Sequence, residues 1–124
     1  INIILNPRSG EGKKKKLFAR ALERFNERGQ EVRVFETKGG QAALLAHDLS
    51  QEGGDLVVIG GDGTLHEVIN GFSDFENCAL GLIPAGTGND FAAAAGIPLE
   101  PEKAVDLILD TQPQFTEFMQ FPQG

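Results

Sequence analysis

Residues 57–72 read VVIGGDGTLHEVINGF, and this stretch decides the fold. An apolar run at residues 57–59 leads into Gly60-Gly61-Asp62-Gly63-Thr64, after which apolar residues recur at the spacing of one helix face. The pattern predicts a buried strand, a tight turn and an amphipathic helix, the repeating unit of an α/β protein. It also raises the question of why three glycines and a carboxylate stand at the end of a strand.

The same unit repeats outward in both directions from this stretch. We expect strands at residues 1–5, 31–36, 55–59, 79–83 and 114–121, and helices at 13–28, 41–51, 65–72, 89–95 and from Pro101 onward. Gly29 and Gly96 are predicted to end helices, since glycine readily adopts the left-handed conformation found there. The alternation predicts a three-layer α/β fold, in which a mostly parallel sheet carries helices on both faces.

Composition bounds the class of protein. The chain has 124 residues, enough for one domain with its own core. Its formal net charge of −7 argues against a nucleic-acid-binding surface, which would need a basic patch. The single cysteine, Cys78, permits no internal disulfide and fits a reducing compartment. No apolar run approaches the roughly 18 residues of a membrane span.

Glycine-rich segments follow three of the predicted strands, at residues 9–12, 60–63 and 86–88, and Thr37-Lys38-Gly39-Gly40 follows another. In a parallel sheet all of these would meet at one edge, where α/β proteins bind ligands. Glycine lets backbone N–H groups approach phosphate oxygens, and a helix N-terminus adds its dipole. The segments therefore predict a polyphosphate site. A carboxylate beside phosphates calls for a cation, so Asp62 is predicted to organise Mg²⁺.

Two familiar phosphate-binding motifs are absent. Lys13 is followed by Lys14 where a P-loop needs serine or threonine, and the dinucleotide fingerprint lacks its third glycine. The four lysines at residues 13–16 are also typical of a solvated helix face. Lys13 is nevertheless a predicted phosphate neighbour, since a bound anion would relieve the conflict between these lysines and the dipole of the helix they begin.

Structural roles stay open for several of these residues. Each glycine segment alone fits an ordinary turn between a strand and a helix. Thr64 and Glu67 also match a capping box, in which both side chains bond the first helical turn. Asp90 could merely complement a helix dipole. Asp62 could accept a proton instead of organising a metal, although surrounding phosphates favour the metal role.

The motifs together resemble the diacylglycerol kinase catalytic domain family, which includes bacterial diacylglycerol kinases and sphingosine kinases. The resemblance runs from residue 6 to residue 98 through three blocks. They are Asn6-Pro7-x-Ser9-Gly10-x-Gly12-Lys13, Gly60-Gly61-Asp62-Gly63-Thr64 and Pro84-Ala85-Gly86-Thr87-Gly88-Asn89-Asp90-Phe91. The second block is shared with NAD kinases and phosphofructokinases, whereas the third is more specific.

The resemblance implies a fold like the nucleotide-binding domain of NAD kinases and diacylglycerol kinases. It also implies transfer of the ATP γ-phosphoryl group to a lipid hydroxyl, with Mg²⁺ as cofactor and Asp62 as the catalytic and metal-organising residue. Other implied roles are nucleotide binding by the segment after the first strand, phosphate contact by Thr37, and phosphate wrapping by the loops around Asp62 and Thr87. The implied nucleotide-site residues are Asn6, Pro7, Arg8, Ser9, Gly10, Lys13, Thr37, Gly60, Gly61, Asp62, Gly63, Thr64, Leu65, His66, Glu67, Gly86, Thr87, Asn89 and Asp90.

The family carries a second, β-rich domain that closes the cleft and supplies a base and further metal-site residues. The resemblance therefore implies an ATP-binding domain over residues 1–112 and the start of the lipid-binding domain over residues 113–124. We expect this polypeptide alone to bind nucleotide weakly and to be inactive. The whole protein is expected to be cytoplasmic and to visit membranes transiently.

Two positions depart from the family pattern. His66 stands where many members have asparagine, and Ala93 stands where many bacterial members have arginine. Two other functions stay open: an NAD kinase-like enzyme, which would share the Gly-Gly-Asp-Gly block, and a nucleotide-binding domain without catalysis.

Overall fold

The computed structural model describes residues 1–6, 15–37, 41–52, 55–71, 79–85 and 89–110. Its sheet has four parallel strands in the order β2-β1-β3-β4. The strands are β1 (Asn2–Leu5), β2 (Arg33–Glu36), β3 (Leu56–Gly60) and β4 (Leu80–Pro84). The helices are α1 (Lys15–Glu27), α2 (Ala42–Glu52), α3 (Asp62–Gly71), α4 (Asp90–Ala95) and α5 (Pro101–Asp110).

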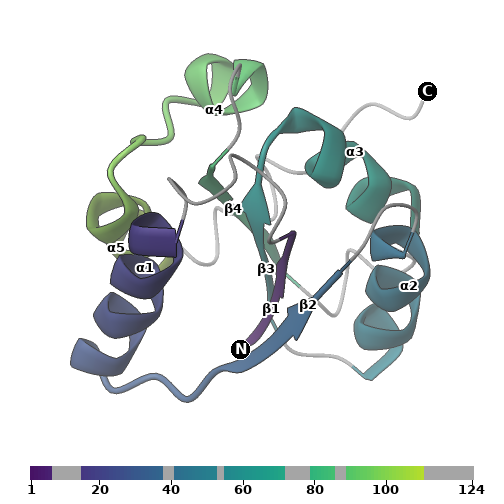
Figure 1. Ribbon diagram of the computed structural model, residues 1–124, viewed down its shortest axis with the longest axis horizontal. Coiled ribbons are helices and arrows are strands. Elements are labelled where there is room, and N and C mark those ends of the chain that lie inside the picture. Colours follow the sequence, from purple (N-terminus) through teal and green to yellow (C-terminus); the bar gives the residue numbers. More distant parts are fainter. Residues whose placement is uncertain (7–14, 38–40, 53–54, 72–78, 86–88, 111–124) are drawn as a thin grey trace.

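The helices form two layers around the sheet, as the three-layer prediction requires. Figure 1 shows α1 and α5 together on one face, α2 and α3 on the other, and α4 beyond the carboxyl ends of the strands. Strands β3 and β4 are buried along their whole length. This burial explains their continuous apolar sequence, which is typical of parallel strands covered on both faces. The predicted strand at residues 114–121 lies outside the described residues.

Helix ends follow the predicted chemistry. Gly29 and Gly96 both have the left-handed backbone, with φ of 74° and 73°. After α1, the N–H of Gln30 donates to the carbonyl of Phe25 at 2.9 Å, a bond that closes the last turn. Pro101 occupies the first position of α5, where its missing N–H costs nothing.

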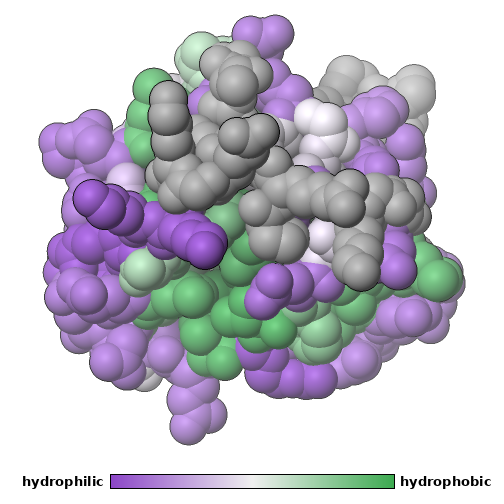
Figure 2. All heavy atoms as spheres, in the orientation of Figure 1, coloured by the Kyte–Doolittle hydropathy of each residue, from purple (hydrophilic) through white to green (hydrophobic). Residues whose placement is uncertain are grey.

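Strand β2 lies at the edge of the sheet and is the most exposed strand. Val34 is 40 % exposed, while Phe35 and Val32, the residue just before the strand, are half-buried. Figure 2 shows hydrophobic surface in the lower middle of the view, with hydrophilic surface on either side of it. Arg33 lies over the Phe35 ring, 5.1 Å from its centroid.

Helices α2 and α3 pack closely at Gly71. A Cβ atom added there would overlap the backbone carbonyl of Ala43 in α2. Gly71 is therefore a packing requirement of the fold. Within the described residues, none of the helices combines the length and apolar character that a membrane span needs.

Helices α1 and α5 run in the same direction and are joined by an arginine ladder. Its rungs, spaced four residues apart, are Arg20 to Glu102, Arg24 to Asp106 and, just after the end of α1, Arg28 to Asp110. In the central rung Arg24 donates from Nε and Nη2 to the two Asp106 oxygens at 2.8 and 3.0 Å. Arg28 also donates to Asp106, at 2.9 Å.

We expect the ladder to make stability depend on pH. Hydrogen bonding from Arg24 is the largest cause that lowers the pKa of the Asp106 carboxyl from its ordinary 3.8, and Arg28 adds to it. A carboxyl whose pKa is lowered by folding stabilises the fold above the ordinary value and loses that contribution as the pH falls through the lowered one. Asp106→Asn should therefore reduce Tm slightly at pH 7, since exposed ion pairs are screened. The difference from the natural protein should vanish below the lowered pKa.

Thermal unfolding followed by circular dichroism between pH 2 and pH 7 would test this. Asp48→Asn, the same change at an exposed position of α2, is the matched control. A Tm difference for Asp106→Asn that stayed constant over this whole range would show that the ladder does not contribute through the Asp106 charge.

Candidate nucleotide site

The strand register aligns the candidate residues at one edge of the sheet. Leu5 at the end of β1 pairs with Glu36 of β2 and Ile59 of β3, and Gly60 pairs with Pro84 of β4. In the sheet, β2 lies next to β1 on one side and β4 lies next to β3 on the opposite side. The direction in which successive strands are added therefore reverses between β1 and β3. Open α/β sheets bind ligands at such a reversal, outside the carboxyl ends of the strands.

The structure describes twelve of the predicted site residues and brings them to this edge or to α3 and α4 beside it. These are Asn6, Thr37, Gly60, Gly61, Asp62, Gly63, Thr64, Leu65, His66, Glu67, Asn89 and Asp90. The others lie outside the described residues: Pro7, Arg8, Ser9, Gly10, Lys13, Gly86 and Thr87. Their predicted roles stay predictions.

Helix α3 begins earlier than its apolar pattern predicted. The N–H of Leu65 already donates to the carbonyl of Gly61 at 3.0 Å, and the helix includes Asp62 and Gly63. Thr64 therefore lies inside the first turn and not at the N-cap, so the predicted capping box is wrong. The backbone N–H groups of that first turn have no acceptor within the helix, and such groups at a helix start are suited to bind an anion.

Two glycines of this turn differ in what the fold requires of them. A Cβ at Gly60 would come within 3.0 Å of the Thr64 Cβ, because Thr64 is buried against the end of β3. A Cβ at Gly63 would meet no described atom within 4 Å, and the backbone there is an ordinary helical one. Glycine weakens a helix relative to alanine by about 0.5–1 kcal/mol. The packing of the described residues therefore does not explain why position 63 has glycine and not a residue that stabilises the helix more.

The Asp62 carboxylate bonds the first turn of α4. Its Oδ2 accepts the N–H of Asp90 at 2.7 Å and its Oδ1 accepts the N–H of Phe91 at 3.1 Å. Sequence reasoning missed this contact, since residue 62 and residue 90 are 28 positions apart. The sequence did contain one indication of this contact. Asp62 and Asp90 follow neighbouring strands of the predicted parallel sheet, and Asp90 stands at a predicted helix start, whose N–H groups need an acceptor.

Other predicted residues take positions that fit less direct roles. Thr37 is 3 % exposed, and its N–H donates to the carbonyl of Leu5 at 2.9 Å, which extends the pairing of β2 with β1. Leu65 is 3 % exposed and belongs to the core. His66 is exposed and Glu67 is half-buried, both on α3.

The residues present fit a magnesium ion that would be held mainly by the phosphates of a bound nucleotide and by water. Among the described residues, no group of three or more histidine, cysteine or acidic side chains could hold a metal. Mg²⁺ commonly needs only one or two carboxylates, because it retains waters and binds substrate phosphates. Asp62 can supply one, since each of its oxygens keeps a second lone pair beside the backbone bond.

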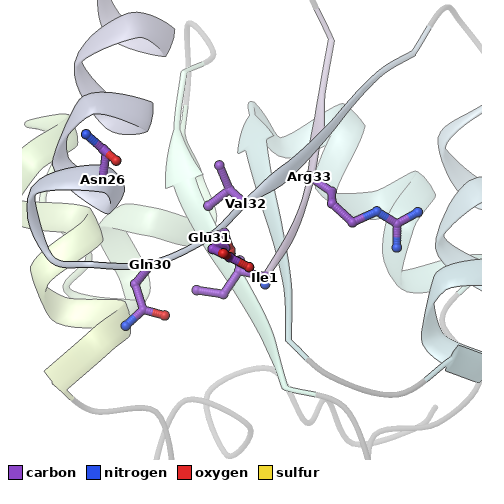
Figure 3. Close-up of a pocket in the computed structure, with 6 residues that line it drawn as sticks. All are labelled: Ile1, Asn26, Gln30, Glu31, Val32 and Arg33. Atoms are coloured by element: carbon purple, nitrogen blue, oxygen red, sulfur yellow. Dashed lines mark hydrogen bonds between the residues drawn. The ribbon is translucent and has the colours of Figure 1, made fainter.

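A hollow of about 520 Å³ lies at the opposite edge of the sheet and is not part of this site. Figure 3 shows it at the start of β1 and β2, with Val32 and Arg33 pointing to different sides of the strand. Two of the polar groups that line it are already bonded to each other, since the amino group of Ile1 donates to the carbonyl of Glu31 at 3.2 Å. The described candidate residues, such as Asp62 and Asp90, lie at the other end of the strands.

Comparison with known proteins agrees with this geometry. The family model described as the diacylglycerol kinase catalytic domain matches residues 1–121. The chain belongs to the diacylglycerol kinase catalytic domain family. The resemblance of the motifs and the predicted fold class are thereby confirmed.

Members of the diacylglycerol kinase family share much of this sequence. A diacylglycerol kinase of Bacillus subtilis (strain 168) is 42 % identical over 112 residues, which cover 87 % of this chain and 37 % of that protein. One of Staphylococcus carnosus (strain TM300) is 39 % identical over 111 residues, which cover 87 % of this chain and 36 % of that protein. The chain thus spans little more than a third of these relatives.

A solved family structure has the same fold. The crystal structure of a diacylglycerol kinase from Bacillus anthracis str. Sterne superposes with a TM-score of 0.77 and 29 % identity. The match covers 88 % of this chain and 39 % of that one.

Asn89 lies in the block that is most specific to the family. We expect asparagine to stand there because it tolerates a left-handed backbone conformation. It has φ of 52° and precedes α4 without making a capping bond from its side chain. Asparagine tolerates this conformation better than most residues other than glycine. Asn89→Ala should therefore lower the free energy of unfolding by about 1 kcal/mol, and Asn89→Gly by less. Urea denaturation of both variants would test this, and an equal loss in the two would assign the stabilising role to the side chain.

Proposed function

We propose that this chain is the ATP-binding part of a kinase that transfers the γ-phosphoryl group of ATP to a lipid hydroxyl, such as that of diacylglycerol. Family membership and the names of the relatives support kinase activity. The observation that carries the nucleotide site is Gly63, whose missing side chain leaves the first turn of α3 open where the described fold does not require it.

The backbone of this turn would hold phosphate oxygens. The N–H groups of Asp62, Gly63 and Thr64 point out of the start of α3, and the helix dipole favours negative charge there. Asn6 stands beside this turn at the neighbouring strand end, where the loop after β1 begins. Phosphoryl transfer depends chiefly on positioning and on neutralising charge, which suits such an arrangement.

Asp62 is the residue proposed to meet the metal. When bound, Mg²⁺ would neutralise charge on the phosphates during transfer. Asp62 would contact it directly or through water, using the lone pairs that its bonds to α4 leave. The remaining metal ligands and the general base would come from outside the described residues.

The division of the protein is also a proposal. Residues 1–112 would form the ATP-binding domain, and residues 113–124 would begin a β-rich domain that binds the lipid. The share of the relatives that this chain spans, 37 % of the Bacillus subtilis protein, supports it. The whole protein would act in the cytoplasm and visit the membrane surface to reach its substrate.

Gly63→Ala tests the nucleotide site separately from folding. The new methyl group meets no described atom, so the free energy of unfolding should stay equal or rise by about 0.5–1 kcal/mol. It would obstruct the approach of a phosphate, so ATP affinity measured by calorimetry should fall more than about tenfold, or 1.4 kcal/mol. Gly71→Ala in the same helix is the opposite case and should cost about 1–3 kcal/mol of stability through its overlap with α2. Unchanged ATP affinity in Gly63→Ala would contradict the proposed site.

Lipid phosphorylation tests the proposed reaction. The polypeptide of residues 1–124 is expected to bind ATP weakly and to transfer no phosphate. The protein as the gene encodes it should phosphorylate diacylglycerol in mixed micelles, in an assay that follows ³²P from γ-labelled ATP. NAD in place of the lipid is the control acceptor, and transfer to NAD alone would replace the lipid kinase by an NAD kinase-like enzyme. Lipid phosphorylation by residues 1–124 alone would contradict the proposed division of labour.

A further inference from the structure

The residues on either side of the connection between β4 and α4 are hydrogen-bonded to residues 60–62, at the end of β3 and the start of α3. At its start, the N–H of Ala85 donates to the carbonyl of Gly60 at 2.8 Å. At its end, the N–H groups of Asp90 and Phe91 donate to the Asp62 carboxylate at 2.7 and 3.1 Å. The two attachments flank residues 86–88 on both sides, and both acceptors lie within residues 60–62.

The second attachment is unusual for a helix start. The first N–H groups of a helix are commonly bonded by the side chain of the residue just before it. Asn89 holds that position in α4 but makes no such bond, because its backbone is left-handed. The acceptor comes instead from the neighbouring strand end. A carboxylate that accepts N–H groups forms stronger bonds than a neutral acceptor does.

Helix α4 needs this support because it is short. It has six residues, and Ala92 is its buried residue. A helix of this length is unstable by itself in water. Its two hydrogen bonds to Asp62 join its first turn to the first turn of α3.

We propose that Asp62 is a positioning residue whose carboxylate clasps the first turn of α4 to the first turn of α3, and so holds the start of α4 beside the nucleotide phosphates. We call its two hydrogen bonds, to Asp90 and Phe91, the clasp. The part concerning phosphates rests on the proposed function. The clasp itself requires neither metal nor nucleotide, which separates it from a role of Asp62 as metal ligand.

Amide hydrogen exchange tests the clasp in the metal-free, nucleotide-free protein, used as the gene encodes it. Asp62→Asn keeps the size of the side chain but offers one acceptor oxygen and turns an NH₂ group toward a donor. Exchange at Asp90 and Phe91 should become at least about tenfold faster, since a local opening loses two charge-assisted bonds. Asp48→Asn, at an exposed site on α2, should leave these two amides unchanged. Unchanged exchange in Asp62→Asn would overturn the clasp.

A second measurement needs no variant, in case Asp62→Asn fails to fold. Nuclear magnetic resonance of the natural protein should show scalar couplings across the hydrogen bonds, from the amide nitrogens of Asp90 and Phe91 to the carboxyl carbon of Asp62. Their presence without metal would support the clasp, and their absence at resolved, assigned amides would overturn it.

Calorimetric titration with ATP, in Mg²⁺ and in EDTA, tests what the clasp does. If Asp62 positions the first turn of α4, Asp62→Asn should weaken ATP binding about tenfold in EDTA, and at least as much in Mg²⁺, where its contact to the metal is lost as well. A loss confined to the Mg²⁺ buffer would make Asp62 a metal ligand and overturn the positioning role. If the natural protein bound no ATP in either buffer, the proposed function would fail and the role beside phosphates with it, while the exchange result would still decide the clasp.

Discussion

The parallel register of β1, β3 and β4 is the constraint on which the rest of the structure depends. Because Ile59 pairs with both Leu5 and Ile83, the chain emerges from three strands at the same level of one edge. Two of these strands are buried on both faces, so they cannot slide without displacing core side chains. The register thus holds Asp62 within hydrogen-bond distance of a helix that starts 28 residues later.

Much of the fold could be predicted because local chemistry and tertiary structure agree. Gly29, Gly96 and Pro101 stand where helices end or begin, and the four described strands lie within two residues of their predicted bounds. The start of α3 was predicted too late. The apolar pattern begins at Leu65, whereas the hydrogen-bond ladder of the helix reaches back to Gly61, where no apolar residue marks it.

The site was predictable in place but not in detail. Alternation of strands and helices was enough to bring the loops after β1 and β3 to one edge. The roles of individual glycines could not be predicted, because glycines at different positions are required for different structural reasons. Gly60 leaves room for Thr64, Gly71 leaves room for the backbone of α2, and Gly63 leaves space that none of the described residues fills. Such differences depend on atoms distant in sequence, which a single sequence does not reveal.

The arginine ladder has a consequence for the order in which the molecule forms. Its rungs connect residues 82 positions apart, at opposite ends of the described chain. A ribosome releases the arginines of α1 long before the acidic residues of α5 that pair with them. During synthesis one face of the sheet therefore stays half-covered until α5 has emerged, and until then Arg20 and Arg24 have acidic partners, among the described residues, only in Glu23 and Glu27 of their own helix. Since contacts distant in sequence form late, the docking of α5 is the step that completes this layer.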